Sequence, residues 1–122
     1  MTLSRTEIDT LDKFDLPSKR HINCIRFDAQ SKSTHRNLIL RLAQEAMDNQ
    51  HNYLTRARLE THSDSPFDRE KIVADFVDLS TGEIVEVAVS EGQKSLDRKQ
   101  KIYEKYGLRM LVIRGYKGNR KP

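Results

Sequence analysis

Two acidic residues lie in neighbouring apolar segments of the chain and could bind a metal ion together. Asp75 belongs to the segment 71–79 and Glu86 to the segment 83–90, and both segments are rich in apolar and β-branched residues. A buried carboxylate is unfavourable unless a cation compensates it, and two adjacent carboxylates repel each other. A divalent cation would remove both costs, so the pair is a candidate metal site. The alternative is that Asp75 lies at the rim of the core and Glu86 pairs with a neighbouring Lys or Arg.

The two segments have the pattern of a β-hairpin, because the turn residues Ser80-Thr81-Gly82 separate them. Side chains alternate between the faces of a strand, so the length of the turn decides whether the two acids meet. A two-residue turn, Thr81-Gly82, would place both acids on one face, whereas a three-residue turn would separate them. The sequence leaves both open. Both faces of the hairpin are apolar, which predicts helices packed on each side.

A lysine lies on the apolar face of the last predicted helix, residues 95–106. Lys99 follows Leu96 by three residues and precedes Tyr103 by four, and this spacing places the three side chains on one face. The helix comes directly after the strand of Glu86, so its apolar face should pack on that sheet. Lys99 therefore either reaches towards the two acids or packs its stem on the tyrosines and extends its ammonium group into water.

The remaining elements complete a regular order. Residues 33–48 have the apolar stripe of a helix, and Ser33 or Thr34 could cap it. Strands are predicted at residues 52–60, before the hairpin, and 109–114, after the last helix. The order helix, strand, strand, strand, helix, strand predicts an α/β fold with a mixed four-stranded core sheet flanked by helices.

The first 32 residues form an accessory segment ahead of this domain, which spans residues 33–122 and includes a basic C-terminal tail. Ser4 could cap a short helix that Pro17 would end. Residues 22–27 could form an edge strand. No chemical role follows from the sequence of this segment.

Composition excludes several classes of protein. The chain has 122 residues, which suits one domain, and its 36% hydrophobic content argues against a disordered protein. No apolar stretch reaches the roughly 18 residues of a membrane span, and the first residues lack the apolar core of a secretion signal. We therefore expect a cytoplasmic protein without membrane contact. Cys24 is the only cysteine, which excludes an internal disulfide and a zinc finger.

Positive charge collects in the last quarter of the chain. Residues 91–122 contain ten Lys or Arg against three Asp or Glu, a local charge of +7 within a net charge of +4 for the whole chain. Such asymmetry favours a polyanionic partner, and DNA is the partner that we expect. The alternative is a solvated basic tail that keeps the protein soluble.

The layout over roughly residues 33–114 resembles the PD-(D/E)xK, or restriction-endonuclease-like, nuclease superfamily. That family has an αβββαβ core, with its first acid on the second strand and its second acid on the third. Asp75 and Glu86 match these positions, with Ala74 in place of the motif's proline. The family's lysine two residues after the second acid is Ala88 in this chain.

Some members of the superfamily carry this lysine on the following helix, where Lys99 and Lys94 are the candidates. One branch, typified by recombination exonucleases, has a Gln-x-x-x-Tyr motif on that helix. The stretch Lys99-Gln100-Lys101-Ile102-Tyr103 looks like a version of it with Lys in the first position. The same branch places a histidine on the first helix, and His35 matches. The alternative for His35 is an ordinary core histidine.

The resemblance implies an activity and a site. Mg²⁺ or Mn²⁺ would be held by Asp75 and Glu86, with His35 as a further ligand, while Lys99 or Lys94 would orient water or bind the scissile phosphate and Tyr103 would complete the catalytic motif. The phosphate contacts expected elsewhere come from Arg98, Lys101, Arg114, Lys117, Arg120 and Lys121.

The implied function is a metal-dependent DNA endo- or exonuclease, of a resolvase-like kind in repair, recombination or a mobile element. Its substrates would be branched or single-stranded DNA, and a homodimer is among the assemblies expected. The alternative is a catalytically inactive nucleic-acid-binding or assembly module on the same fold, which Ala88 favours. A weaker third interpretation is a small protein-binding subunit. Metal dependence separates the first two.

Overall fold

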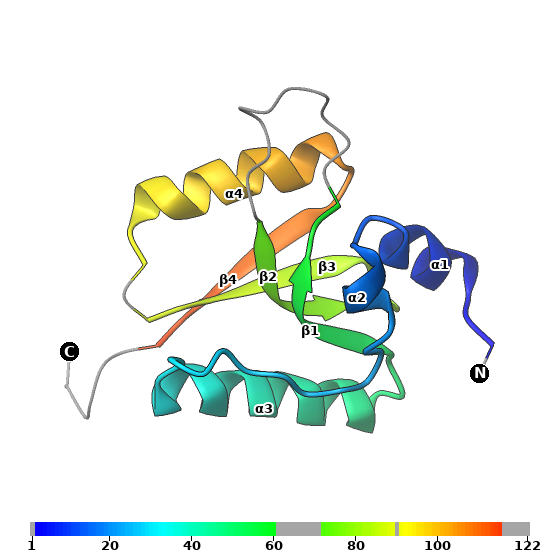
Figure 1. Cartoon of the computed structure of the whole chain (residues 1–122), viewed down its shortest axis with the longest axis horizontal. Helices are drawn as coiled ribbons and strands as arrows, with labels where there is room; N and C mark the ends of the chain where they lie inside the picture. Colours follow the sequence, from blue (N-terminus) through cyan, green and yellow to red (C-terminus); the bar gives the residue numbers. More distant parts are fainter. Residues whose placement is uncertain (1, 61–71, 90, 116–122) are drawn as a thin grey trace.

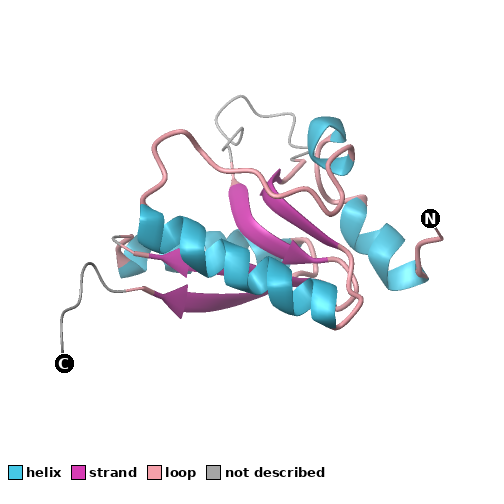
Figure 2. Cartoon of the chain, turned by 90° about the horizontal axis from the view of Figure 1, so that it is seen from below, coloured by secondary structure: helices cyan, strands magenta, loops and turns pink. Residues whose placement is uncertain are grey.

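Four strands form one mixed sheet within the described residues, and the two longest helices pack on its opposite faces (Figure 1). The computed structural model describes residues 2–60, 72–89 and 91–115. Its elements in chain order are α1 (Arg5–Leu11), α2 (Leu16–Lys19), α3 (Ser33–Asp48), β1 (Tyr53–Arg58), β2 (Val73–Asp78), β3 (Glu83–Ala88), α4 (Gln93–Lys105) and β4 (Arg109–Arg114). Seen from the α3 side, that helix lies across the strands (Figure 2).

The sheet has the strand order β1-β2-β3-β4. β1 pairs with β2 and β2 with β3 in antiparallel fashion, whereas β3 and β4 are parallel. Parallel neighbours need a crossover connection, which α4 provides. The predicted α/β fold with a mixed four-stranded sheet flanked by helices is therefore confirmed.

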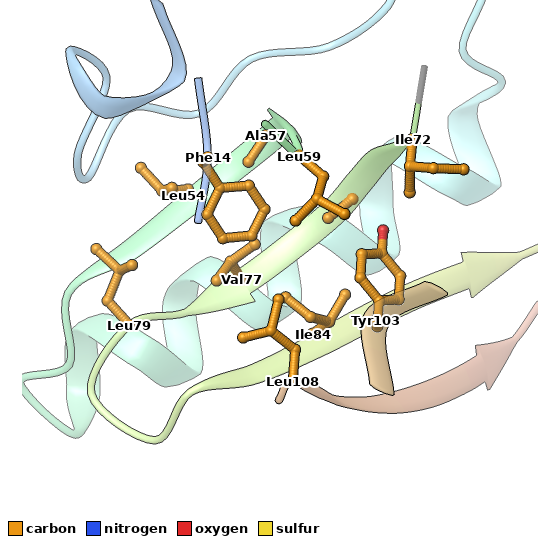
Figure 3. Close-up of a cluster of buried hydrophobic side chains, with 11 residues drawn as sticks. Phe14, Leu54, Ala57, Leu59, Ile72, Val77, Leu79, Ile84, Tyr103 and Leu108 are labelled. Atoms are coloured by element: carbon orange, nitrogen blue, oxygen red, sulfur yellow. The ribbon is translucent and has the colours of Figure 1, made fainter. Parts of the chain in front are cut away.

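Apolar side chains fill both sides of the sheet. On the α4 side, Tyr103 packs in a cluster with Ile84 and Leu108 (Figure 3). On the α3 side, Tyr53 and Phe76 stack with ring centroids 5.4 Å apart, beneath the alanines of α3. Strands covered on both faces are apolar at nearly every position, which explains why the hairpin segments lack simple alternation.

The β2–β3 hairpin has a longer loop than either length considered from the sequence. Asp78 pairs with Glu83, so the four residues 79–82 form the connection. The Asp78 carboxylate accepts hydrogen bonds from the backbone N–H groups of Ser80 (2.9 Å) and Thr81 (3.1 Å), which supports a turn without strand geometry. An even number of connecting residues keeps Asp75 and Glu86 at directly opposed positions.

Two expected helix boundaries differ in the structure. Lys32, rather than Ser33 or Thr34, occupies the N-cap of α3, and no side chain caps that helix. In the N-terminal segment, α1 ends at Leu11, and Pro17 lies in the first turn of α2 instead of ending the first helix. A proline is tolerated in a first turn because that N–H has no helical partner.

The N-terminal segment shares the core of the domain. Phe14 is 0% exposed, packs in the α4-side cluster (Figure 3) and forms an isolated β-bridge with Leu59. Residues 22–27 do not form the expected strand, since Asn23 has a left-handed backbone (φ 62°). The segment is attached at the start of β1 by one backbone hydrogen bond, from Asn23 N to the carbonyl of Tyr53 (2.8 Å), and by side chains, including a hydrogen bond from Asn23 Nδ2 to Asn52 Oδ1 (2.9 Å).

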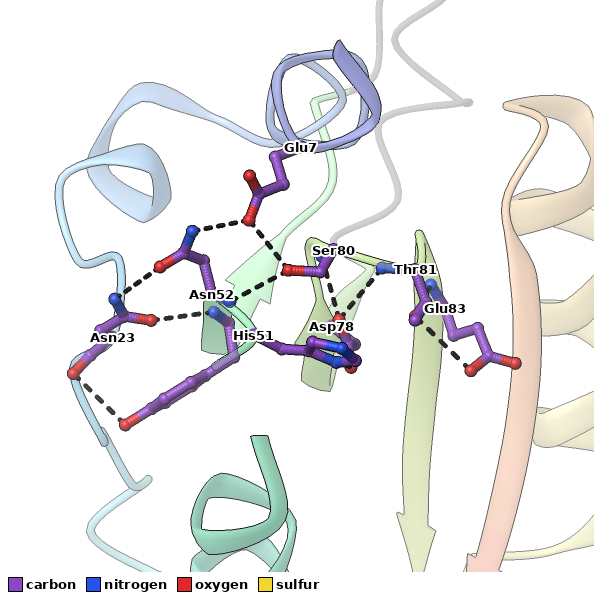
Figure 4. Close-up of polar contacts among 9 residues, drawn as sticks. Glu7, Asn23, His51, Asn52, Asp78, Ser80, Thr81 and Glu83 are labelled. Carbon is purple, nitrogen blue, oxygen red and sulfur yellow. Dashed lines mark hydrogen bonds and ion pairs between the residues drawn. The ribbon is translucent and has the colours of Figure 1, made fainter. Parts of the chain in front are cut away.

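Glu7 joins α1 to the start of β1 and to the hairpin loop (Figure 4). Its carboxylate accepts hydrogen bonds from Ser4 N (2.8 Å), Asn52 Nδ2 (2.6 Å) and Ser80 Oγ (2.9 Å). The backbone N–H of Ser4 is the main cause that lowers the pKa of Glu7 to about 2; burial opposes it, and the Asn52 and Ser80 bonds add to it.

We expect Glu7→Gln to make stability less sensitive to acid. A carboxyl whose pKa is lowered in the folded state contributes stability above its unfolded pKa, about 4.5, and loses it as the pH falls to about 2. The wild-type free energy of unfolding should therefore fall more steeply than that of Glu7→Gln between these values. Urea unfolding from pH 6 to pH 2 measures this. Asp9→Asn, at an exposed position of the same helix, is the control; parallel curves for wild type and Glu7→Gln would contradict the prediction.

Candidate active site

The two acids lie where β2 and β3 stop pairing. The paired register runs from Asp78 opposite Glu83 to Phe76 opposite Val85, and the next positions are Asp75 and Glu86. There the backbone ladder is replaced by side chains.

The N–H of Asp75 donates to Glu86 Oε2 (3.1 Å), and the N–H of Val87 donates to Asp75 Oδ2 (2.7 Å). Each carboxylate thus binds the backbone of the other strand. Both carboxylates consequently lie between β2 and β3, where the pairing of these two strands stops.

The ladder between β1 and β2 is interrupted directly opposite Asp75. The register pairs Thr55 with Phe76 and Ala57 with Ala74, and it skips Arg56, which falls opposite Asp75. Arg56 has φ 49°, in the left-handed region that non-glycine residues rarely adopt. Asp75 therefore has no paired residue on the β1 side.

Glu86 is the most deeply buried charged group of the site. It is 0% exposed, and the ammonium group of Lys99 donates a hydrogen bond to its Oε1 at 2.7 Å. Burial is the main cause that raises the pKa of Glu86 to about 7, and the charge of Asp75 adds to it, while Lys99 acts in the opposite direction. The ammonium group of Lys99 is therefore directed inward, which is the first of the two orientations that the helix spacing allowed.

Lys99 connects two acids rather than one. Its Nζ also lies 3.1 Å from Glu91 Oε2. Burial lowers the pKa of Lys99, but the charges of Glu86 and Glu91 outweigh burial and raise it. Lys99 is therefore a firmly charged cation held between two carboxylates. Glu91 was missed by sequence reasoning, because no periodic spacing relates it to the acid pair.

His35 binds the outer acid of the pair. Its Nε2 lies 3.2 Å from Asp75 Oδ1, and this contact raises the pKa of His35 against the effect of burial. Its Nδ1 is buried and has no hydrogen-bond partner among the described residues. His35 is thus a partner of Asp75, and not simply a core residue of α3.

Tyr103 lies behind the site, fully buried between α4 and the sheet. Burial raises the pKa of its hydroxyl, and so do the charges of Glu86, Asp75 and Glu91. The hydroxyl makes no hydrogen bond of regular geometry to a described residue, although Glu86 lies close enough for a weak one that also raises this pKa.

A buried hydroxyl without a regular hydrogen bond lowers the free energy of unfolding. Removing it in Tyr103→Phe should therefore leave the stability unchanged or raise it by up to about 1 kcal/mol. Thermal unfolding tests this. Tyr106→Phe, which alters the half-buried tyrosine at the end of the same helix, is the control. A loss of more than about 1 kcal/mol would show that the hydroxyl is hydrogen-bonded in solution.

Several predicted site residues lie away from the acid pair. Lys94 is exposed and does not line the pocket described below. Arg98 and Lys101 are exposed on α4, and Arg114 binds Gln93 through a hydrogen bond of 2.6 Å. The positions of Lys117, Arg120 and Lys121 are outside the described residues.

A pocket of about 440 Å³ opens onto the site. Asp75, His35 and Lys99 line it together with Glu91. Its outer part carries basic residues that sequence reasoning did not select, namely Arg26, Lys32 and Arg56. Arg26 comes from the N-terminal segment, where no motif marks it.

The site has the oxygen donors that a hard divalent cation prefers, although few of them. Among the described residues, no group of three or more His, Cys, Asp or Glu side chains is arranged to hold a metal ion. The pair Asp75 and Glu86 would therefore rely on water ligands, which Mg²⁺ usually retains. The ammonium group of Lys99 already binds Oε1 of Glu86. A divalent ion at Asp75 and Glu86 would therefore have to share Glu86 with Lys99 and keep most of its ligands as water.

Comparisons with known proteins indicate no function, so an assignment rests on the geometry of the site. The chain matches no protein-family model, and neither the curated proteins nor the solved structures contain a match to it. Across the described ranges, no helix is both long and apolar enough to cross a membrane.

Proposed function

We propose that the protein is a metal-dependent DNA nuclease with a restriction-endonuclease-like fold. One observation carries the proposal: Asp75, Glu86 and Lys99 converge at the point where β2 and β3 separate, beside an open pocket. Two carboxylates and one ammonium group are the charges that phosphodiester hydrolysis uses. The basic C-terminal quarter supports DNA as the substrate.

Each residue has a role that its chemistry supports. When bound, a divalent cation lowers the pKa of a coordinated water and neutralises charge on the phosphate. Asp75 and Glu86 would hold that ion together with the main-chain carbonyl of Val87. The ammonium group of Lys99 would orient the attacking water or bind the scissile phosphate. The attacking water would lose one proton to solvent as its oxygen bonds to phosphorus, and the bond to the leaving oxygen would break as that oxygen takes up a proton from solvent.

A second candidate is a non-catalytic nucleic-acid-binding module on the same fold. The observation that favours it is Ala88, which stands in the usual place of the family's lysine and is only 3% exposed. In this case Lys99 would serve only to compensate the buried charge of Glu86.

A cleavage assay separates the two candidates. Single-stranded, duplex and branched DNA are incubated with the protein and Mg²⁺ or Mn²⁺, and in parallel with a chelator. We expect cleavage that requires the metal and is lost in Asp75→Asn. Glu104→Gln, which changes an exposed acid on α4, is the matched control and should cleave as wild type. Binding without cleavage under every condition would support the non-catalytic module.

A further inference from the structure

We infer that Arg26 and Arg56 form a binding site for a backbone phosphate of the DNA strand next to the acid pair. The inference rests on the proposed function and extends it to how the substrate is held. Both arginines line the same pocket as Asp75 and Lys99. They lie on its β1 side, whereas Lys99 lies on its α4 side.

Arg26 is held in place by the backbone of β1. Its N–H donates to Thr55 Oγ1 (2.7 Å), and that hydroxyl donates in turn to the carbonyl of Cys24 (2.8 Å). Thr55 is 0% exposed, so this attachment is part of the folded core. The guanidinium Nη2 donates to the carbonyls of Thr55 (3.3 Å) and Arg56 (3.2 Å). One nitrogen therefore fixes the orientation of the group.

The rest of the Arg26 guanidinium group lacks partners. Its Nε is buried and makes no hydrogen bond to any described residue. No carboxylate within the described ranges lies at ion-pair distance from Arg26, although three acids line the pocket. Leaving a buried N–H donor of a permanent cation without a hydrogen bond costs stability. A planar guanidinium group with unused N–H donors is suited to an oxyanion, and above all to phosphate.

Arg56 lies next to this group and opposite Asp75. Its left-handed backbone (φ 49°) interrupts β1 at the register position of Asp75. Its side chain is about half exposed and contacts Asp28 at 3.4 Å, a weak surface pair that an incoming phosphate could replace. Lys32 also lines the pocket. The four Lys and Arg side chains of the lining exceed its three acids, Asp28, Asp75 and Glu91, by one positive charge.

The chemistry that fits is a phosphodiester within a strand. The acid pair repels anions unless a metal ion is bound, so a phosphate outside it needs positive charge of its own. Arg26 and Arg56 supply that charge beside Asp75, where the phosphate adjoining the scissile one would lie. The two arginines would thus set the position of the strand while Lys99 acts at the reacting group.

The test measures DNA binding separately from cleavage. Fluorescently labelled single-stranded and duplex DNA are titrated with Asp75→Asn protein in a chelator, at several salt concentrations. Adding Arg26→Gln or Arg56→Gln should weaken binding about tenfold, as expected for a charge-assisted hydrogen-bonded contact. Each should also lower the slope of log affinity against log salt by about 1. Arg41→Gln, which removes an exposed arginine of α3 that does not line the pocket, should change affinity less than twofold.

Two further comparisons separate the possible outcomes. Arg26→Gln also removes bonds to β1, so Arg56→Gln, whose side chain bonds only weakly, tests the site without disturbing that attachment. Wild-type affinity and slope in both variants would overturn the inference and leave the nuclease proposal standing. Loss of binding in both, in a protein that never cleaves DNA, would support the phosphate site and overturn the nuclease. Competition by micromolar mononucleotide would show a free-nucleotide pocket and overturn a strand-binding site.

Discussion

Replacing Lys99 with Met is expected to reduce metal-dependent DNA cleavage by about 10²- to 10³-fold, the usual cost of removing one group that stabilises the transition state. Lys99 is the cation that contacts Glu86 in the structure, at 2.7 Å. Methionine keeps most of the apolar stem of Lys99 but removes the charge. Single-turnover cleavage with Mg²⁺ measures the effect, and DNA affinity and thermal unfolding are followed in parallel.

The fold should survive this substitution. Without Lys99, the charge of Glu86 is left uncompensated, which would be severe for a carboxyl locked in its ionised form. Glu86 has another option, because burial and Asp75 already raise its pKa to about 7. It takes up a proton near neutral pH instead, and this limits the loss of stability.

Lys94→Met is the matched control for this experiment. Lys94 lies on the same helix but is exposed and does not line the pocket, so its variant should cleave at the wild-type rate. Full activity in Lys99→Met, together with a loss in Lys94→Met, would transfer the role to Lys94. Full activity in both variants would show that cleavage uses no lysine of α4.

The sequence was sufficient to predict the elements of residues 33–114 and the position of Lys99 on the apolar face of α4, because both depend on periodicity; it left open whether the ammonium group points inward or into water. The order of helices and strands follows from apolar stripes, and α4 needs an apolar face to cover β3 and β4. Lys99 lies between Leu96 and Tyr103 on that face, so helix geometry alone directs it to the sheet. The contact with Glu86 then follows from the short connection between β3 and α4.

The details that sequence reasoning missed depend on side chains that replace regular backbone pairing. Leu79 reads as the end of a strand, yet the Asp78 carboxylate holds the following residues in a turn and lengthens the hairpin loop. Arg26 enters the pocket because the Thr55 hydroxyl, rather than a strand ladder, attaches its segment to β1. No local pattern predicts the second contact, since Arg26 and Thr55 are 29 positions apart.

The backbone kink at Arg56 is a further example. Nothing in the sequence Thr55-Arg56-Ala57 marks a left-handed residue within a strand, because glycine and asparagine are the usual signals. The kink lies opposite Asp75, at a residue that lines the pocket. Local strain of this kind is concentrated at functional sites and is maintained by the surrounding fold.

Glu86→Gln is expected to change how stability depends on pH. The pKa of Glu86 is raised from 4.5 to about 7 in the folded protein. A group with a raised folded pKa contributes stability that is fully present below its unfolded pKa and is lost as the pH rises through the folded value. Wild type should therefore lose about 3 kcal/mol between pH 4.5 and pH 8, a loss that Gln, which does not titrate, avoids.

Unfolding by urea in the presence of a chelator measures this difference across the pH range. The free energies of unfolding of the two proteins at pH 4.5 serve as the reference. As the pH rises from there, the free energy of unfolding of Glu86→Gln should increase relative to that of wild type. Asp75→Asn should weaken the pH dependence of wild type, since the charge of Asp75 helps to raise the pKa of Glu86. Glu104→Gln, at an exposed position of α4, is the control and should follow wild type.

Adding Mn²⁺ should reverse the order of stability. An ion that binds the folded state at 100 times its dissociation constant stabilises it by about 2.7 kcal/mol, and this gain requires the ionised pair Asp75 and Glu86. Wild type should therefore become more stable than Glu86→Gln at pH 8 once the metal is present, whereas the mutant should respond little. An equal response to Mn²⁺ in the two proteins would place the metal elsewhere. A wild-type stability that is flat from pH 4.5 to pH 8 in the chelator would show that Glu86 stays ionised, with Lys99 fully compensating its burial.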